Sequence, residues 1–330
     1  MFNEQLYNTP YHSVDLSEYS FLVTGGAGFI GSNIVEYLLK YNAKHVRVLD
    51  NLSNGYFENI SFFEGLSNFE FIQGDIRNIE TCRAAVIGMD FISHQAALGS
   101  VPRSVEDPAT TNDVNISGFL NMLIAAKEEK SIKRMVYAAS SSTYGDNKEL
   151  PKIEDRIGKP LSPYAVTKFV NELYADVFYK VYGLKTIGLR YFNVFGPRQS
   201  PDNPYAAVIP LFVKAAISAQ PPKINGNGEQ TRDFTFVENV IQANIKALLV
   251  QDELAVNQVF NIAFGERISL NQLWEYICTC TGQNPIPSYQ PNRPGDIMDS
   301  LADISKAKHI LGYEPIFSVK EGLNILINGF

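Results

Sequence analysis

The chain has 330 residues, of which 45% are hydrophobic and 19% are charged, and its formal net charge is −7. This composition is typical of a globular protein with a large core, and an acidic chain without a dense basic run argues against nucleic-acid binding. The sequence contains neither an obvious targeting peptide nor a stretch of the ~20 apolar residues that cross a membrane. We therefore expect a cytoplasmic protein with no nucleic-acid or membrane partner.

Metal and disulfide sites are not expected. The chain has three cysteines, Cys82, Cys278 and Cys280, in no CxxC motif, and its four histidines are scattered. An odd number of cysteines without metal-ligand spacing is typical of free thiols in a reducing compartment.

In chain order, residues 1–18 show no clear periodicity, and we expect an extension that lies on the main domain. Short apolar runs then alternate with helical patterns, which predicts a parallel sheet with helices on both faces. The strands are predicted in the runs 19–26, 45–51, 69–77, 90–97, 134–145 and 186–197, and helical patterns lie notably at 29–42, 110–129 and 162–182.

The composition changes after Pro197, where the regular sheet pattern breaks. We predict a nucleotide-binding domain at 1–197 and a smaller lobe at 198–330. The apolar run at 259–265 has the character of a strand that returns to the main sheet.

A glycine-rich turn follows the first strand. Gly25, Gly28 and Gly31 are spaced G-x-x-G-x-x-G, and Asp50 ends the next strand. The first glycine permits a tight turn, the second lets the backbone approach a pyrophosphate, and the third allows close helix packing. The helix N-terminus favours phosphate, and the Asp50 carboxylate can accept hydrogen bonds from ribose hydroxyls. NAD is favoured over NADP, because the carboxylate would repel a 2′-phosphate.

A second pattern indicates proton transfer. Tyr164 and Lys168 are four residues apart on a predicted helix, so their side chains are neighbours. The lysine can lower the pKa of the phenol. Ser140 ends a strand whose carboxyl end is expected to face the same crevice.

These motifs, together with "RYFNVFGP", resemble the extended short-chain dehydrogenase/reductase superfamily. The stretches "HQAALGSVPRSVEDP", "YAASSSTYGD" and "LPKIEDRIGKPLSPYAVTKFVNELYADV" resemble bacterial UDP-N-acetylglucosamine 4-epimerases and their uronic-acid relatives, which serve surface polysaccharide biosynthesis. The resemblance implies a Rossmann-type, doubly wound α/β domain with a smaller α/β C-terminal substrate lobe. It also implies tightly bound NAD and a homodimer joined by a four-helix bundle of the helices near 110–129 and 162–182.

The resemblance also implies roles for individual residues. Tyr164 would be the base at the sugar 4-hydroxyl, Lys168 would hold the nicotinamide ribose, and Ser140 would assist. With Tyr164 and Lys168, the expected NAD contacts are Gly25, Gly28, Phe29, Ile30, Asp50, Asn51, Ser53, Gly55, Asp75, Ile76, Gln95, Ala97 and Tyr191. The expected contacts to the UDP moiety are Asn193, Val208, Asn225, Arg232, Arg293 and Asp296.

The expected reaction and sugar substrate follow from single positions at which members of the resembled family differ from one another. Dehydratases and decarboxylases of this family carry carboxyl groups just after the Ser140 position, where this chain has Ser141 and Ser142, so epimerisation is the expected reaction. The resemblance implies that Ser300 falls on the position that walls the sugar pocket, where its small size would leave room for an acetamido group. We expect UDP-GlcNAc and UDP-GalNAc as substrates, with the uronate as the alternative. The remaining expected sugar contacts are Gly99, Ser100, Ser141, Ser142 and Gln199.

Overall fold

The computed structural model describes residues 4–202, 205–291 and 298–328. At its centre is a seven-stranded sheet with the order β11-β6-β5-β4-β1-β2-β3, in which every neighbouring pair is parallel. The strands are β1 (Ser20–Thr24), β2 (His45–Asp50), β3 (Phe69–Gln73), β4 (Phe91–His94), β5 (Arg134–Ser140), β6 (Thr186–Tyr191) and β11 (Gln258–Ile262). The predicted Rossmann-type α/β fold is confirmed.

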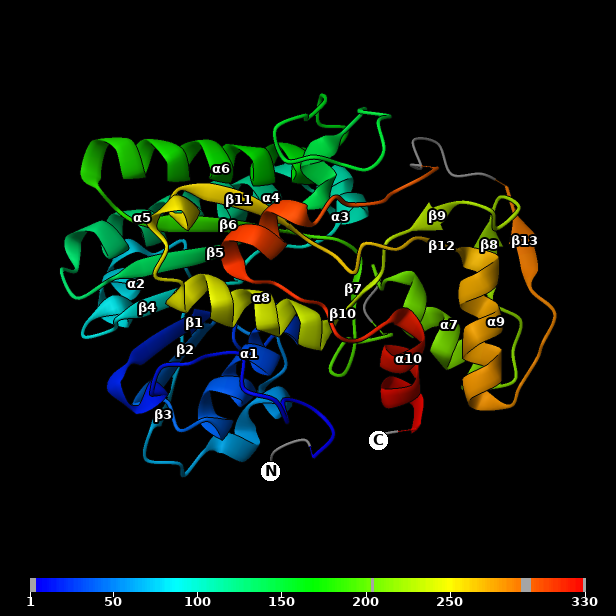
Figure 1. Ribbon diagram of the computed structural model, residues 1–330, viewed down its shortest axis with the longest axis horizontal. Helices are drawn as coiled ribbons and strands as arrows, with labels where there is room; N and C mark the ends of the chain where they lie inside the picture. Colours follow the sequence, from blue (N-terminus) through cyan, green and yellow to red (C-terminus); the bar gives the residue numbers. More distant parts are fainter. Residues whose placement is uncertain (1–3, 203–204, 292–297, 329–330) are drawn as a thin grey trace.

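Helices cover both faces of the sheet (Figure 1). One face carries α1 (Phe29–Lys40) and α8 (Val237–Leu249), and the other carries α2 (Ile79–Val86), α5 (Phe119–Glu128) and α6 (Pro163–Tyr182). Neighbouring side chains of a strand point to opposite faces, so a strand covered on both sides is apolar throughout.

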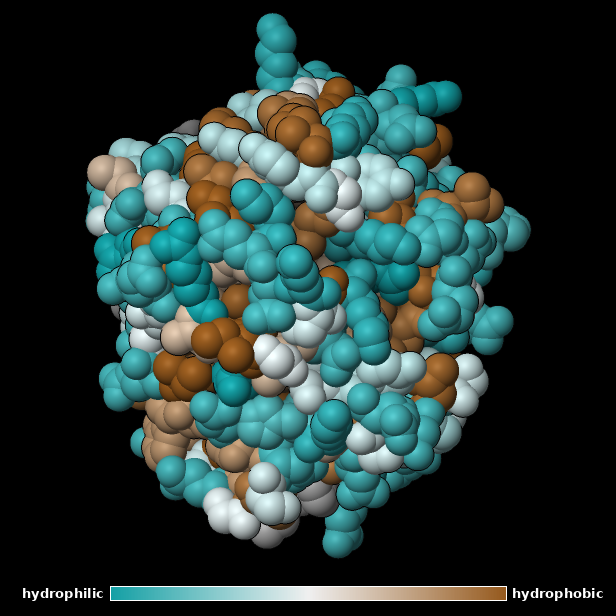
Figure 2. All heavy atoms as spheres, turned by 90° about the vertical axis from the view of Figure 1, so that its left-hand side faces the viewer, coloured by the Kyte–Doolittle hydropathy of each residue, from teal (hydrophilic) through white to brown (hydrophobic). Residues whose placement is uncertain are grey.

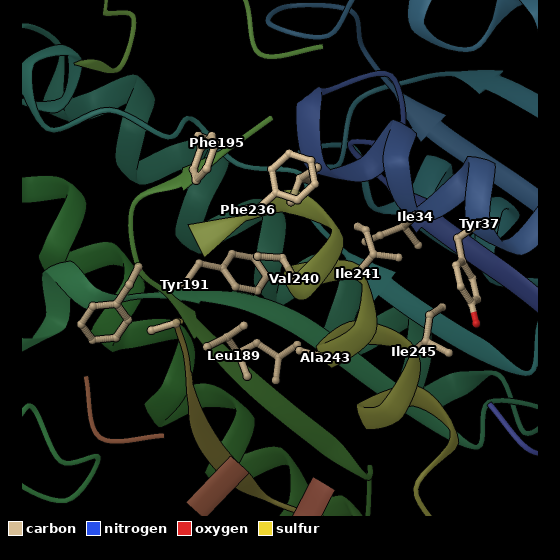
Figure 3. Close-up of a cluster of buried hydrophobic side chains, with 14 of the residues drawn as sticks. Ile34, Tyr37, Leu189, Tyr191, Phe195, Phe236, Val240, Ile241, Ala243 and Ile245 are labelled. Carbon is tan, nitrogen blue, oxygen red and sulfur yellow. The ribbon is translucent and has the colours of Figure 1, made fainter. Parts of the chain in front are cut away.

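The first strand illustrates this arrangement, because all five residues of β1 are buried. Phe21 and Val23 join the core beneath α1 and α8, whereas Leu22 joins the core beneath α2 and α5. Figure 3 shows part of the first core, in which Val240 and Ile241 of α8 pack between Ile34 of α1 and Tyr191 of β6.

Two predicted elements differ from the structure. The run 134–145 ends as a strand at Ser140, because residues Ser141–Tyr144 turn into a 3₁₀ helix at the edge of the sheet. The helical pattern at 110–129 is divided into α4 (Pro108–Asn112), a π-helical turn (Asp113–Gly118) and α5. Asn115 in that turn bonds to Leu98 and to Thr167 of α6, which ties the irregular turn to its neighbours.

The smaller lobe lies beyond the carboxyl ends of the strands, at the right of Figure 1. It contains α7 (Val208–Ile217), β8 (Lys223–Asn225), β9 (Thr231–Arg232), β12 (Ile268–Ser269), α9 (Leu270–Thr281), β13 (Ser288–Gln290) and α10 (Val319–Asn328). The run 259–265 returns to the main sheet as β11, and α8 also packs on that sheet. The short pair β7 (Val194–Phe195) and β10 (Thr235–Phe236) joins the two parts. The boundary after Pro197 stays a prediction.

The described part of the N-terminal segment packs against α1 and α8. Leu6, Tyr7 and Tyr11 are buried there. The Glu238 carboxylate on α8 accepts hydrogen bonds from the Tyr7 backbone N–H (2.9 Å) and from the Tyr11 hydroxyl (2.6 Å). The segment is therefore part of the core rather than a loose tail.

The side of the molecule that lies to the left in Figure 1 carries hydrophobic side chains in patches separated by hydrophilic ones (Figure 2). Across the described ranges, no helix combines the length and the apolar character needed to span a bilayer.

Candidate active site

A cleft of about 590 Å³ opens at the carboxyl ends of the central strands. The chain order of the strands reverses between β1 and β4, and in open α/β sheets ligands bind in the crevice at such a point. The cleft is lined by the turn after β1, the ends of β4, β5 and β6, and the start of α6.

The glycine-rich turn forms one wall of this cleft. Gly25 has a φ of 68°, and a side chain there would place its Cβ 2.7 Å from the Ala96 nitrogen. A Cβ on Gly31 would lie 2.1 Å from the Gly25 carbonyl oxygen, so the helix can start this close to the turn only with glycine. Gly28 is the N-cap of α1 and offers no side-chain cap. The start of α1 therefore suits a phosphate group, as expected for a bound dinucleotide.

Asp50 lies at the cleft with both carboxylate oxygens engaged. Oδ2 accepts the Ala27 N–H at 3.0 Å and Oδ1 accepts the Leu52 N–H at 2.8 Å, while burial raises the pKa of the carboxyl. The carboxylate thus anchors the glycine-rich turn. Each oxygen keeps a lone pair for a ribose hydroxyl.

The expected catalytic pair lies at the start of α6. Ser162 caps this helix by accepting the Ala165 N–H, and Pro163 occupies its first turn. The Lys168 ammonium donates to the Ala138 carbonyl at 2.7 Å and lies 6.0 Å from the centre of the Tyr164 ring. Together with Ser140, both side chains line the cleft.

Burial governs the pKa values of both members of the pair in this structure. Burial raises the pKa of Tyr164, and a hydrogen bond with Ser140 offsets part of that rise. The Lys168 ammonium is engaged with the Ala138 carbonyl. Burial also lowers the pKa of Lys168 to about 8, against the opposing effect of Glu172.

The serines after β5 form a short hydroxyl chain. The Ser142 hydroxyl donates to Ser140 Oγ at 2.9 Å, and Ser140 is in turn hydrogen-bonded with Tyr164. Ser142 thus holds the Ser140 hydroxyl in place by a hydrogen bond, and it also lines the cleft.

Most of the predicted site residues meet in this one cleft. The predicted residues among those lining it are Gly25, Gly28, Phe29, Ile30, Asp50, Asn51, Ser53, Gly55, Ile76, Gln95, Ala97, Gly99, Ser100, Ser140, Ser141, Ser142, Tyr164, Lys168, Tyr191, Asn193 and Gln199.

Asp75 is not among the residues that line the cleft, because its carboxylate is held by Arg77 (2.7 Å) and by the Asn51 amide (2.9 Å). Val208 is also absent from that lining, although the preceding Ala207 is part of it.

The other UDP-directed residues lie in the smaller lobe, apart from the cleft lining. Arg232 donates to the Met298 carbonyl. Ser300, expected at the sugar pocket, is likewise absent from the cleft lining, and its N–H donates to the Thr231 carbonyl. Asn225 ends the neighbouring strand β8. Arg293 and Asp296 lie outside the described residues.

Sequence reasoning missed two residues at the mouth of the cleft. Arg103 of α3 (Val101–Glu106) lies with its guanidinium carbon 5.0 Å from the ring centre of Tyr205, and both residues line the cleft. Arg103 falls within the quoted stretch "GSVPRSVEDP", but neither charge nor spacing there distinguishes it from a surface arginine.

Comparison with known proteins agrees with this geometry. Residues 21–263 match the model of the NAD dependent epimerase/dehydratase family. The chain belongs to this family. The match includes the glycine-rich turn and the Tyr164–Lys168 pair, so this member of the epimerase/dehydratase family is an NAD-dependent enzyme.

Individual relatives cover nearly the whole chain. A putative UDP-glucose 4-epimerase of Methanocaldococcus jannaschii is 37% identical over 93% of this chain and 97% of its own. The structure of a UDP-N-acetylglucosamine 4-epimerase from Methanobrevibacter ruminantium, in complex with UDP-N-acetylmuramic acid, is 39% identical with a TM-score of 0.88, covering 94% and 97% of the two chains. A UDP-glucuronic acid 4-epimerase from Bacillus cereus, in complex with UDP-glucuronic acid and NAD, is 32% identical with a TM-score of 0.87, covering 94% and 98%.

Proposed function

We propose that this enzyme is a UDP-sugar 4-epimerase that interconverts UDP-GlcNAc and UDP-GalNAc. The observation that carries the proposal is the meeting of Tyr164, Lys168 and Ser140 with the glycine-rich turn in one cleft. The similarity to UDP-sugar 4-epimerases over more than nine tenths of the chain supports it.

The glycine-rich turn, Asp50 and Lys168 would hold the cofactor. Bound NAD supplies reversible acceptance of hydride from C4 of the sugar. A positively charged nicotinamide beside Tyr164 would oppose the effect of burial on the phenol pKa. As the phenolate, Tyr164 would accept the proton of the 4-hydroxyl, with Ser140 and Ser142 orienting that hydroxyl, and would return the proton after the sugar has presented its other face. Neither proton nor hydride is lost overall, so the product is an epimer of the substrate.

Dehydration or decarboxylation on the same scaffold is disfavoured. Ser141 and Ser142 lie in the cleft where those reactions need carboxyl groups. A hydroxyl near its ordinary pKa is a poor acid or base for such steps.

The acetamido preference rests on the small Ser300 and on the similarity to the Methanobrevibacter enzyme. The uronate UDP-N-acetylglucosaminuronate is a second candidate, because Arg103 places a cation at the mouth of the cleft. A guanidinium is well suited to bind the 6-carboxylate that a uronate carries.

The test is incubation of the purified enzyme separately with UDP-GlcNAc and with its uronate, followed by NMR of the anomeric protons. We expect UDP-GalNAc from the first without a change of mass. A product of altered mass would establish elimination or decarboxylation instead. Conversion of the uronate alone would assign the second candidate.

A substitution of Tyr164 tests its assignment as the base. Tyr164→Phe is expected to lower turnover by roughly 10²–10⁴-fold, because it removes the acid–base group. NAD released on denaturation of the protein should stay at the wild-type amount. Unchanged turnover would contradict the role of Tyr164.

We also infer that the protein forms a homodimer through α6. Val166, Leu173, Val177 and Val181 are exposed on this helix at helical spacing. Such an apolar stripe is suited to a helix-to-helix contact between two copies, as in the four-helix bundle expected from the sequence.

A further inference from the structure

Helix α8 contains a fully buried amide whose position needs an explanation. Asn244 is 0% exposed, and its sequence neighbours on α8, Ala243 and Ile245, belong to the apolar core and are labelled in Figure 3. Burying an amide in such surroundings costs free energy unless its donors and its acceptor are satisfied. An apolar residue of similar size would suit a purely structural role at this position.

The Asn244 amide closes a ring of hydrogen bonds with two other side chains. Its Nδ2 donates to Tyr191 Oη at 2.9 Å, and its Oδ1 accepts from Gln95 Nε2 at 3.1 Å. Tyr191 Oη lies 3.2 Å from Gln95 Oε1 and 3.1 Å from Asn244 Oδ1. Tyr191 has one hydrogen to donate, and donation to Gln95 Oε1 gives every donor in the ring an acceptor of its own.

The ring connects three elements beneath the reacting centre. Gln95 directly follows β4, Tyr191 ends β6, and Asn244 belongs to α8. Between β4 and β6 runs β5, which ends at Ser140. Gln95 and Tyr191 line the cleft, whereas Asn244 lies behind them.

The ring fixes which atom Gln95 can offer to a ligand. One amide hydrogen of Gln95 goes to Asn244 Oδ1, and the other goes to Ser93 Oγ at 3.0 Å. With both hydrogens used, Gln95 has only the second lone pair of Oε1 left for a ligand. Without Asn244, the Gln95 amide can rotate and present its NH₂ group instead.

We propose that Asn244 is a positioning residue for bound NAD. It acts through Gln95 and Tyr191, and it leaves the Gln95 carbonyl oxygen as the hydrogen-bond acceptor that faces the cofactor. The proposal depends on the NAD dependence of the family and not on the identity of the sugar.

The test compares two leucine substitutions on α8. Asn244→Leu keeps the size of the side chain and removes the ring. Asn239→Leu is the matched control, because Asn239 is also fully buried but bonds to the backbone of Ile316 and Phe317. The measurements are NAD released from the purified protein by denaturation, and titration of the stripped protein with NAD.

For Asn244→Leu we expect an NAD Kd raised about tenfold or more and a matching loss of retained NAD. Asn239→Leu should retain NAD as the wild type does, even if its melting temperature falls by as much as that of Asn244→Leu. Wild-type affinity in Asn244→Leu would overturn the proposal, and so would an equal loss of affinity in Asn239→Leu.

A double-substitution cycle tests the ring itself. Tyr191→Phe removes only the hydroxyl group that Tyr191 contributes to the hydrogen-bond ring. If Asn244→Leu does not fold, Tyr191→Phe alone tests the ring. Because both changes open the same ring, Tyr191→Phe/Asn244→Leu should lose little more affinity than the weaker-binding single variant. Independent, multiplicative losses would overturn the coupling, as would Tyr191→Phe with wild-type NAD affinity.

Discussion

His94 is held neutral at the end of β4, directly before Gln95. Its Nδ1 lies 2.8 Å from Thr24 Oγ1. Burial, with a smaller contribution from Lys168, lowers the pKa of the imidazole to about 3. The unfolded chain binds a proton at His94 near pH 6.5, whereas the folded chain does not, so stability falls as pH falls from about 6.5 toward 3.

This linkage predicts the effect of removing the imidazole. In His94→Asn, the loss of unfolding free energy between about pH 7.5 and about pH 5 should be smaller than in the wild type by about 2 kcal/mol. Urea unfolding at the two pH values measures it. The exposed His309 provides the control, since His309→Asn should keep the wild-type difference. If His94→Asn lost as much unfolding free energy between the two pH values as the wild type, His94 would not be the source of this pH dependence.

Ser300 carries the prediction on sugar choice. A tyrosine at this position would crowd a 2-acetamido group, so Ser300→Tyr should lower kcat/KM for UDP-GlcNAc by at least about tenfold. Its kcat/KM for UDP-glucose should be unchanged or higher. Parallel assays with the two sugars measure the ratio, and equal losses for both would remove Ser300 from the sugar pocket.

For individual residues, the sequence predicted the roles of those side chains that local spacing makes recognisable. Gly25, Ser140 and Tyr164 are recognisable because each follows or starts a periodic element. Asn244 and Arg103 are not, because their significance arises from contacts with residues far away in the chain. The orientation of Lys168 toward the Ala138 carbonyl is likewise a tertiary feature that the sequence pattern does not reveal.

Among the elements, α8 holds several segments at once through its buried polar residues. Glu238 binds the N-terminal segment, Asn239 and Gln242 bond to the backbone of residues 314–317, and Asn244 serves the cleft. These side chains bond to three separate parts of the chain. The helix therefore fixes the relative positions of these segments and of the sheet.

The contact between Tyr11 and Glu238 can be tested directly. Tyr11→Phe removes a donor from a buried carboxylate, which should lower the free energy of unfolding by about 1–3 kcal/mol. Denaturant titration gives the value. Tyr289→Phe, at an exposed tyrosine, is the matched control and should change it little. Equal stability of Tyr11→Phe and the wild type would show that the contact contributes nothing.

The element order was predictable where apolar periodicity was continuous, as in β1, β6 and α6. It was less so between residues 108 and 128, where Asn115 and Gly118 interrupt one helix with a π-helical turn. A side chain on Gly118 would place its Cβ 2.7 Å from Ile76 Cδ1, so that turn is fitted to a neighbour that the sequence pattern does not reveal. The apolar residues of α8 recur at helical spacing, but this pattern does not reveal that its polar residues, such as Asn239 and Asn244, are buried as well.

For the whole molecule, the exposed stripe on α6 predicts assembly. Leu173→Glu places a charge in the proposed contact between two copies and should convert a dimer to a monomer, as measured by light scattering after gel filtration. Ile217→Glu introduces the same charge at an exposed apolar residue of α7 and should leave the mass unchanged. A wild-type protein that is already monomeric, or a dimer that survives Leu173→Glu, would contradict the α6 interface.

The docking of the N-terminal segment has a consequence for biosynthesis. Tyr7 and Glu238 are 231 positions apart, so Tyr7 emerges from the ribosome long before its acceptor exists. At ordinary translation speeds this delay is roughly 10–50 s. During that interval Leu6, Tyr7 and Tyr11 lack their final partners on α8, so this segment can complete its packing only late in synthesis.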